Sequence, residues 1–393
     1  MSITLTMPSP ALLGVYRPAA PLFVGGEGCR LIDEEGRSYI DFVAGIAVNA
    51  LGYGDAGTTT AMLAALESGL VHTSNLFRTR AAEELAEELV ALSFADRVFF
   101  CNSGGEANEA AIKFARKWAR TQGGSGKHEI VSFRGAFHGR LMGSLALTDR
   151  EAYQAPFTPL MPGAHIVNLY DDAAVQAAVS SERTAAVFIE PVQGEGGVHV
   201  VPAERLVRLR ALTDAANALL VFDEVQCGLG RTGHLFAHEA SDVAPDMMTL
   251  AKPLAAGLPM GATLLAERVA EVMQPGDHAT TFGGGPLVAS VALEILQRVS
   301  SPDLLQHVRA MGAHLVSRVR GWTDLTCIVD LRGRGLMWGI ELDRPAGPVV
   351  AAALENGLLL VTAGQRVIRI VPPLVISRDE LDAGLAILHE VLA

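Results

Sequence analysis

The sequence predicts an α/β fold with a large domain, built on a mostly parallel sheet, and a smaller α+β domain. Three observations lead to this prediction. The chain has 393 residues, which is too long for one ordinary small core. Its middle alternates short apolar runs with amphipathic stretches, as parallel βαβ units do. Its two ends show strand patterns and a closing helix without that alternation.

The predicted strands of the middle are rich in β-branched and aromatic residues, as expected for strands that are covered on both faces. They occupy residues 97–101, 129–133, 165–169, 185–189, 218–222, 247–250 and 262–266. Amphipathic stretches, for example 107–120 and 203–216, lie between them. The second of these begins after Pro202, which is favourable in a first helical turn.

The ends of the chain are expected to form the smaller domain. Short strands are predicted at 22–24, 30–32, 327–331, 336–342, 358–361 and 367–371, and a closing helix at 378–392. A helix at 286–299 begins the crossing between the two domains. We therefore expect residues 1–50 to contribute to the small domain, residues 51–290 to form the large domain, and residues 291–393 to complete the small one.

Composition excludes several classes of function. Half of the residues are hydrophobic, 19% are charged and the net charge is -12, so a nucleic-acid partner is not expected. No apolar run is long enough to span a bilayer. Met1 to Thr4 do not begin a signal peptide, and the four cysteines have no spacing typical of a zinc site or a disulfide framework. We expect a cytoplasmic protein without a metal or a membrane partner.

Four segments of polar and glycine residues each follow a predicted strand. Ligands of open α/β sheets bind beyond the carboxyl ends of the strands, so these segments are expected to meet in space. The first contains Ser103, Gly104 and Gly105 before a predicted helix. Backbone N–H groups in such a turn can bind a phosphate, although an ordinary tight turn is about equally consistent with the pattern.

The second and third segments carry an acid and a lysine at the ends of apolar strands. Asp223 could hold a heterocyclic nitrogen in its protonated form, although a metal ligand or a strand-end cap also fits. Lys252 ends a strand where a buried ammonium is costly. A Schiff base would remove that cost and make the lysine reactive, whereas a single lysine usually extends to solvent. The fourth segment, 190–197, is an acidic, glycine-rich loop that could equally be a structural turn.

As an ordered set, these segments resemble the class III (ω-amino acid) aminotransferases of the fold-type I pyridoxal-phosphate enzymes, and most closely the acetylornithine aminotransferase branch. That branch includes the related transaminase of carrier-protein-linked lysine biosynthesis. The resemblance covers nearly the whole chain and implies a seven-stranded, mostly parallel large-domain sheet. The matching stretches are 45–52, 72–77, 102–113, 137–140, 190–197, 223–233, 250–261, 280–286 and 369–376.

The resemblance implies pyridoxal 5′-phosphate as the cofactor. Lys252 would form the Schiff base, Asp223 would pair with the ring nitrogen, and Phe137 would stack on the ring. Gly104 and Gly105 would bind the phosphate, Gln226 would lie near the ring hydroxyl, and Thr281 would reach the phosphate in the neighbouring subunit of a homodimer. The implied cofactor-binding residues are Ser103, Gly104, Gly105, Phe137, Asp223, Glu224, Val225, Gln226, Lys252 and Thr281.

The resemblance also implies the substrates. An ω-amino donor, N2-acetylornithine or a carrier-linked lysine precursor, would pass its amine to 2-oxoglutarate, giving a semialdehyde and glutamate in arginine or lysine biosynthesis. Arg140 and Thr280 would contact the donor, and Arg369 would bind the α-carboxylate of glutamate or 2-oxoglutarate. Glu195 would pair with Arg369 while the ω-amino donor is bound. A carrier protein would be a partner in the lysine pathway.

The chain departs from the family pattern at three places, and other functions stay open. Residues 53–56 replace the usual His-x-His-Pro, Arg78 replaces an aromatic residue, and Gly285 replaces an asparagine. Arg78 could alter the substrate entrance. The alternatives within the family act on ornithine, succinyl-diaminopimelate, 4-aminobutyrate or glutamate semialdehyde. A non-catalytic regulator that binds the cofactor is a further alternative. A nucleotide-binding module is disfavoured, because neither phosphate-loop fingerprint occurs.

Overall fold

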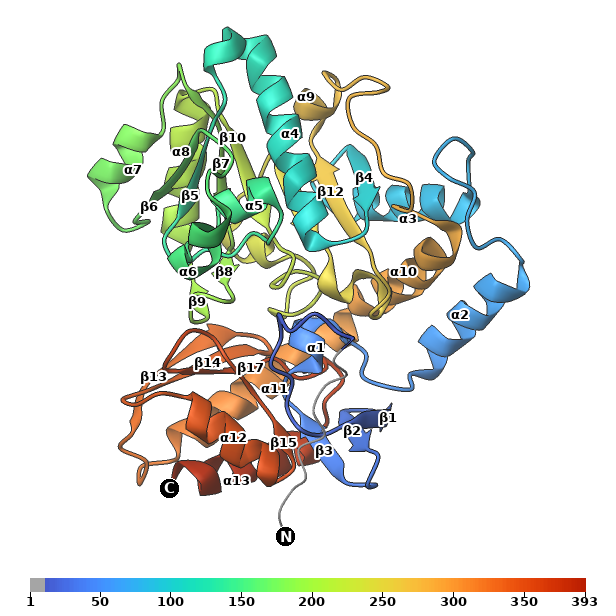
Figure 1. Ribbon diagram of the computed structural model, residues 1–393, viewed down its shortest axis with the longest axis vertical. Coiled ribbons are helices and arrows are strands. Elements are labelled where there is room, and N and C mark those ends of the chain that lie inside the picture. The colour runs from blue at the N-terminus through green and yellow to red at the C-terminus, as the bar shows by residue number, and fades with distance from the viewer. Residues whose placement is uncertain (1–10) are drawn as a thin grey trace.

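The largest sheet has seven strands and forms the middle of the upper lobe (Figure 1). The structure, a computed structural model, describes residues 11–393, so Met1 to Thr4, where we expect no signal peptide, lie outside the described residues. All strands but β12 run parallel, which confirms the predicted mostly parallel sheet. In sheet order they are β4 (Arg97–Cys101), β12 (Gly261–Leu265), β11 (Met247–Leu250), β10 (Leu219–Asp223), β7 (Thr184–Ile189), β5 (Glu129–Phe133) and β6 (Ala164–Val167).

Helices cover both faces of this sheet because its central strands are mostly apolar, and all residues of β7, β10 and β11 are buried. Successive side chains of a strand point to opposite faces. In β10, Leu219 and Val221 pack in one cluster with α4 (Gly104–Gly123). Leu220 and Phe222 pack in another cluster with α7 (Asp172–Ala178) and α8 (Ala203–Ala215). The continuous apolar run predicted from the sequence is therefore the mark of a strand that is buried on both sides.

Two four-stranded sheets form the lower lobe. β1 (Phe23–Glu27), β2 (Arg30–Asp33) and β3 (Ser38–Asp41) come from the N-terminal part, and β15 (Leu358–Leu359) from the C-terminal part completes their sheet. The other sheet has the order β13 (Ile328–Arg334), β14 (Met337–Leu342), β17 (Val367–Ile370) and β16 (Val361–Thr362). A separate two-stranded hairpin of β8 (Val192–Gln193) and β9 (His199–Val200) comes directly after β7 in the chain. We propose that the two lobes correspond to the two predicted domains.

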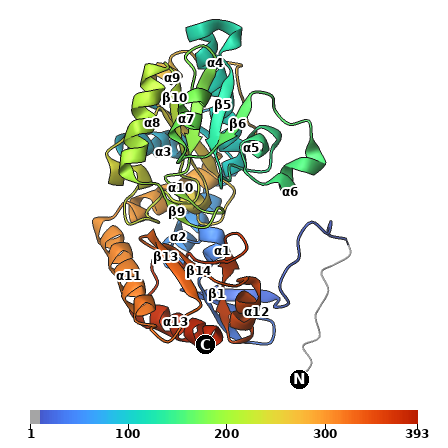
Figure 2. The same ribbon diagram turned by 90° about the vertical axis from the view of Figure 1, so that its left-hand side faces the viewer.

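The remaining helices connect the strands and the lobes. α10 (Pro286–Val299) contacts α2 (Ala56–Glu67), α3 (Arg80–Ala91) and η4 (Lys252–Ala255), and it leads into α11 (Pro302–Arg320), so it joins the two lobes (Figure 2). The others are α1 (Ala44–Ala47), α5 (Met142–Ala146), α6 (Glu151–Gln154), α9 (Glu267–Ala270), α12 (Gly347–Glu355), α13 (Arg378–Leu392) and the short 3-10 helices, which include η4 as well as η1 (Gly124–Gly126), η2 (Ala155–Phe157) and η3 (Ala237–Ser241).

Two details of the smaller sheets differ from the sequence prediction. The single strand predicted at 358–361 is wrong: β15 pairs with β3, whereas β16 pairs with β17 in the other sheet. A short apolar run does not reveal that the chain changes sheets within it, because that depends on tertiary pairing. β3 was also missed, although Tyr39 and Ile40 in it are almost fully buried. Within residues 11–393, no helix is long and apolar enough to cross a membrane.

Candidate active site

The carboxyl ends of the large-sheet strands open onto a cavity of about 300 Å³. Segments that follow β4, β5, β7, β10 and β11 all contribute to its lining, so the four segments singled out from the sequence do meet. Several predicted site residues lie around it. Those that line the cavity are Ser103, Gly104, Gly105, Phe137, Glu195, Asp223, Val225, Gln226 and Lys252.

Lys252 lies directly after β11 at the start of η4 and lines the cavity. Its ammonium makes no hydrogen bond or ion pair with any residue in the described part of the chain. Burial lowers the pKa of Lys252, although the nearby carboxylates of Asp223 and Glu195 oppose this. The chain has four lysines, and the other three lie elsewhere: Lys113 and Lys117 contact residues 277–278, and Lys127 donates to backbone carbonyls. Lys252 is therefore the lysine available for chemistry in the cavity.

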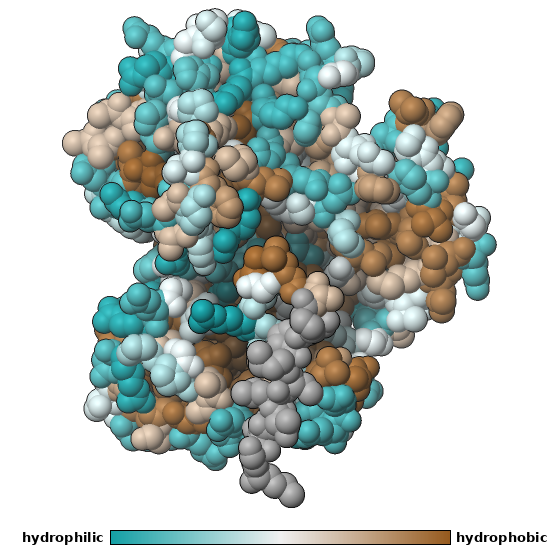
Figure 3. Space-filling model, in the orientation of Figure 1, coloured by the Kyte–Doolittle hydropathy of each residue, from teal (hydrophilic) through white to brown (hydrophobic). Residues whose placement is uncertain are grey.

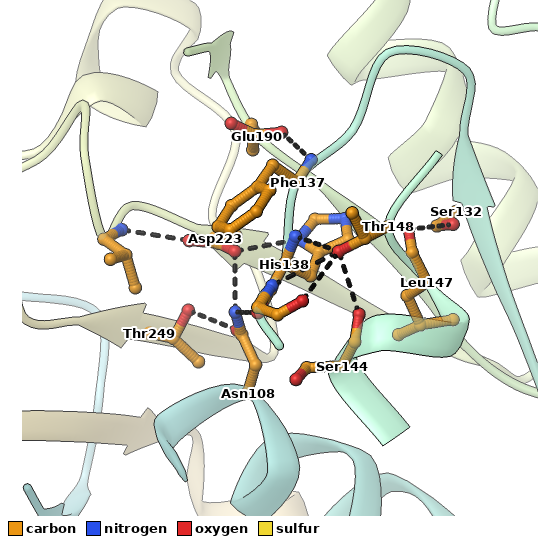
Figure 4. A network of polar contacts seen from close by, with 12 residues as sticks. Asn108, Ser132, Phe137, His138, Ser144, Leu147, Thr148, Glu190, Asp223 and Thr249 are labelled. Atoms are coloured by element: carbon orange, nitrogen blue, oxygen red, sulfur yellow. Dashed lines mark hydrogen bonds and ion pairs between the residues drawn. The ribbon is translucent and has the colours of Figure 1, made fainter. Parts of the chain in front are cut away.

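Asp223 is held by hydrogen bonds on both carboxylate oxygens (Figure 4). Its Oδ2 accepts from Nδ2 of Asn108 at 2.8 Å and faces Nδ1 of His138 at 2.8 Å. Its Oδ1 accepts from the backbone N–H of Val225 at 3.0 Å. Asn108 in turn accepts a hydrogen bond from Thr249 at 2.8 Å. This network fixes the carboxylate at the end of β10, where Asp223 is 3% exposed.

His138 is a site residue that the sequence analysis did not single out. Its ring is buried, and Nε2 has no hydrogen-bond partner within residues 11–393. Burial disfavours the charged imidazole, but the hydrogen bond and the attraction to Asp223 outweigh it and raise the pKa of His138. A protonated Nδ1 donates to the carboxylate and stabilises its charge. The signal was present in the matching stretch 137–140, but only Phe137 and Arg140 were given roles there.

A phosphate-sized anion has a prepared site at the N-terminus of α4. Ser103 caps this 20-residue helix, and its Oγ accepts from the N–H of Glu106 at 3.2 Å. The N–H groups of the first turn have no partners within the helix, and the helix dipole favours negative charge there. A Cβ atom on Gly104 would lie 2.6 Å from Cγ1 of Val225. Only glycine fits between the turn and the segment after β10.

A buried carboxylate joins Phe137 to the acidic loop. Oε1 of Glu190 accepts from the N–H of Phe137 at 2.9 Å, and Oε2 accepts from the N–H of Gly194 at 3.0 Å. Burial raises the pKa of Glu190 to about 7, while His138 opposes the rise. Glu190 therefore ties the aromatic residue that lines the cavity to the loop that carries Glu195. The sequence placed Glu190 in a motif without giving it this role.

Glu195 and Arg369 form an ion pair at the edge of the cavity. Nη1 of Arg369 donates to Oε1 of Glu195 at 2.6 Å and to Oε1 of Gln226 at 3.1 Å. Arg369 is 2% exposed, and its Nε has no partner among the described residues. Arg150 donates to the carbonyl oxygen of Glu195 at 2.7 Å and supports the loop. The arginine is buried and fixed, whereas the Glu195 side chain is 30% exposed and has room to move.

Five predicted site residues lie outside this cavity lining: Arg369, which is described above, and Arg140, Thr280, Thr281 and Glu224. The guanidinium carbon of Arg140 lies 5.9 Å from the ring centroid of Phe137, at the rim. Thr280 accepts from Asn102 at 3.3 Å, and Thr281 lines a second cavity of about 260 Å³ with residues 72–75, 77–79 and 283–286. The carboxylate of Glu224 accepts from the N–H groups of Ala237 and His238, away from the Lys252 cavity. The ligand roles of these residues stay predictions.

Comparison with protein families identifies the chain. Residues 17–392 match the family model of aminotransferase class-III. The chain belongs to the class III aminotransferases. Among its relatives in this family is the acetylornithine aminotransferase, mitochondrial, of Alnus glutinosa, which is 50% identical over 97% of this chain and 85% of the relative. The acetylornithine aminotransferase of Xanthomonas campestris is 46% identical over 97% of this chain and 95% of the relative.

Solved structures of similar aminotransferases confirm the fold. The N-acetylornithine aminotransferase of Stenotrophomonas maltophilia is 39% identical, has a TM-score of 0.84, and is matched over 95% of this chain and 96% of its own. The ornithine aminotransferase of Toxoplasma gondii is 31% identical, has a TM-score of 0.92, and is matched over 97% of this chain and 92% of its own. The predicted resemblance to the class III aminotransferases, and to their acetylornithine aminotransferase branch, is therefore confirmed.

The residues of the cavity fit pyridoxal phosphate, the cofactor of this aminotransferase family. The glycine turn at the start of α4 suits a phosphate, and Asp223 is a fixed carboxylate that suits a protonated ring nitrogen. Phe137 offers an apolar face, and Lys252 offers an amine that has no other partner in the described chain. The phosphate, the ring nitrogen, the ring face and the aldehyde of the cofactor would thus each meet a complementary group beyond a strand end of the large sheet.

Proposed function

We propose that this chain transfers the ω-amino group of N2-acetylornithine to 2-oxoglutarate, giving a semialdehyde and glutamate in arginine biosynthesis. The observation that carries the proposal is the Glu195–Arg369 pair beside the free amine of Lys252. The acetylornithine aminotransferases of Alnus glutinosa and Xanthomonas campestris, 50% and 46% identical over nearly the whole chain, support the choice of donor.

Lys252 and Asp223 are the proposed catalytic residues. Pyridoxal phosphate supplies the aldehyde that takes up the amine and the ring that withdraws electrons. Nζ of Lys252 removes the proton from the carbon that bears the transferred amine and returns a proton later, as a general base and acid. Its lowered pKa suits this exchange. Asp223 stabilises positive charge at the ring nitrogen, and His138 and Asn108 hold Asp223 in place.

The other proposed cofactor contacts follow the shape of the cavity. Ser103, Gly104 and Gly105 would bind the phosphate at the start of α4, and Phe137 would cover one ring face. Val225 and Gln226 would complete the cofactor site. Because Oε1 of Gln226 accepts from Arg369, its Nε2 is the atom available to donate to the ring hydroxyl. Glu224, whose carboxylate is turned toward η3, would contribute through its backbone.

One cavity must accept two different amino donors. N2-acetylornithine reacts at its ω-amine and glutamate at its α-amine. While the first donor is bound, Glu195 neutralises Arg369, so the arginine does not attract a carboxylate. For the second donor, Glu195 swings away and Arg369 binds the α-carboxylate in a charge-assisted pair. Arg140, together with Thr280, would bind the carboxylate end of N2-acetylornithine at the rim.

We also propose a homodimer with shared active sites. Figure 3 shows a hydrophobic area over α2 and its surroundings. Exposed apolar side chains gather on α2 and the loop after it, and Phe282 is 65% exposed beside Thr281. Patches of this kind are typical of protein interfaces. In such a dimer, Thr281 would reach the cofactor phosphate of the neighbouring subunit. The exposed apolar side chains are Leu63, Leu66, Leu70, Val71, Leu76, Phe77 and Phe282.

Comparing kcat/KM across amino donors tests the proposed substrate. The candidates are N2-acetylornithine, ornithine, N-succinyl-diaminopimelate, 4-aminobutyrate and a carrier-linked aminoadipate derivative, each with 2-oxoglutarate as acceptor. We expect N2-acetylornithine to exceed every other donor by at least about tenfold. A higher value for ornithine, the amino acid after which the Toxoplasma gondii relative is named, or for the carrier-linked donor would overturn the assignment. Absence of any turnover would favour a regulator.

The cellular location stays a prediction. The sequence suggests a cytoplasmic protein, but the relatives from Alnus glutinosa and Dictyostelium discoideum are named as mitochondrial. Localisation of the tagged full chain in its own cells tests this point. A carrier protein as a partner is expected only if the carrier-linked donor proves to be preferred.

A further inference from the structure

Arg140 contacts Tyr153, a residue that lies in none of the motifs of the sequence. The guanidinium carbon of Arg140 lies 3.4 Å from the ring centroid of Tyr153 in α6. That is the distance of direct contact between flat groups, and it is much shorter than the 5.9 Å to the ring of Phe137. Arg140 makes no hydrogen bond or ion pair within residues 11–393. The two rings are therefore what holds its charged end in place.

The backbone around Tyr153 is tied to the stretch that carries Arg140. Oγ1 of Thr148 accepts from the N–H groups of His138 and Gly139, at 2.9 and 3.3 Å (Figure 4). Oδ2 of Asp149 accepts from the N–H of Gly135 at 2.7 Å. Gln154, next to Tyr153, donates to the carbonyl oxygen of Thr148 at 2.9 Å. These bonds fix α6 against residues 135–139, so the aromatic ring and the guanidinium are held close by the fold itself.

We propose that Tyr153 is a positioning residue that determines specificity for the carboxylate of the amino donor. This inference rests on the proposed function, in which Arg140 binds that carboxylate. A guanidinium uses its face for an aromatic ring and its edge N–H groups for a carboxylate. The two interactions therefore do not compete. By holding the face of Arg140, Tyr153 presents the edge to the donor before the donor arrives, and less side-chain freedom is lost on binding.

Two donors that differ only in the carboxylate separate this role from a general structural one. N-Acetylputrescine is N2-acetylornithine without its carboxylate. In the holoenzyme, Tyr153→Leu is expected to raise KM for N2-acetylornithine about three- to tenfold, as loss of a cation–π contact predicts. The kcat should stay unchanged, and KM for N-acetylputrescine should not rise. Tyr153→Phe keeps the ring face and should restore nearly normal KM.

Binding without turnover gives an independent measure. N2-Acetylnorvaline has the carboxylate and the acetamide of the donor but no ω-amine. Calorimetry should show its dissociation constant rising by the same factor in Tyr153→Leu. Tyr170→Leu is the matched control, because Tyr170 lies 5.3 Å from the guanidinium carbon of Arg205 on the surface, away from the cavity. That variant should leave both constants unchanged. If Tyr153→Leu does not fold, Tyr153→Met is measured in its place.

Arg140→Gln, which removes the positive charge, distinguishes failure of this inference from failure of the proposed function. If the glutamine variant keeps the full preference for the carboxylate-bearing donor, Arg140 is not the carboxylate site, and both proposals fail at that point. If Arg140→Gln loses the preference but Tyr153→Leu does not, only the role of Tyr153 is wrong. Equal rises in KM for both donors in Tyr153→Leu also overturn it. Non-additive effects on KM for N2-acetylornithine, when the substitutions at Tyr153 and Arg140 are combined in one variant, support the role of Tyr153.

Discussion

Replacing Glu195 by glutamine should change which amino donor the enzyme prefers. Oε1 of Glu195 lies 2.6 Å from Nη1 of Arg369, and the arginine is 2% exposed. Two unit charges about 4 Å apart attract by about 4 kcal/mol at an effective dielectric constant of about 20. Glu195 is 30% exposed, so solvent screens much of this attraction, and we expect about 1–2 kcal/mol to oppose its displacement. Glutamine keeps the shape and a weaker hydrogen bond.

The glutamate half-reaction of Glu195→Gln should therefore improve. Since 1–2 kcal/mol corresponds to a factor of about 5–30, the ratio of kcat/KM for glutamate to kcat/KM for N2-acetylornithine should rise by that factor. Single-turnover measurements of each half-reaction, followed by the cofactor absorbance, give both constants. Glu129→Gln is the matched control, because Glu129 pairs with Arg183 at the opposite end of β5. An unchanged or lower ratio in Glu195→Gln refutes the proposed movement of the pair.

The cavity leads to three further predictions. Gly104→Ala should raise the dissociation constant of pyridoxal phosphate at least about fivefold, because its Cβ would lie 2.6 Å from Val225. Gly105→Ala should change this constant little, because its nearest contacts lie at 3.6 Å. Cofactor titration compares the two variants. Asp223→Asn should lower kcat/KM by about a hundredfold or more and alter the visible spectrum of the holoenzyme, and normal turnover would contradict its role. Burial raises the pKa of Glu190 from 4.5 to about 7, so its stabilising contribution is present below about pH 4.5 and is lost as the pH rises through about 7. The thermal unfolding midpoint of the wild-type apoprotein should therefore fall from pH 5 to pH 8 relative to that of Glu190→Gln. A constant difference between the two midpoints would show that the carboxyl group does not titrate as described.

The large sheet was predictable because its signal is local. Strands buried on both faces need continuous apolar runs, and the predicted strands at 97–101, 129–133 and 247–250 coincide with β4, β5 and β11. The smaller sheets have weaker signals, since strands such as β1, β2 and β13 are partly exposed, although β17 is buried throughout. The division of 358–361 between two sheets depends on partners far away in the sequence, and no local pattern encodes it.

The candidate site was predictable only in part, because the contacts that support it join residues far apart in the sequence. Glycine turns and charged residues at strand ends stand out from the sequence, and Lys252, Asp223 and Ser103 do line one cavity. The residues that support them do not stand out. Asn108 and His138 bond to Asp223 across 115 and 85 positions of the chain, and each alone would pass for a helix or loop residue. The support appears only when the strand ends are brought together.

The central claim is that Lys252 carries the cofactor, and chemical trapping tests it most directly. The holoenzyme is reduced with borohydride, which makes a Schiff base permanent, and its peptides are sequenced by mass spectrometry. The chain has four lysines, so each can be assayed separately. We predict a reduced phosphopyridoxyl group on Lys252 and none on the others. The group on Lys113, Lys117 or Lys127 instead, or an unmodified Lys252 in holoenzyme that turns over, would contradict the claim.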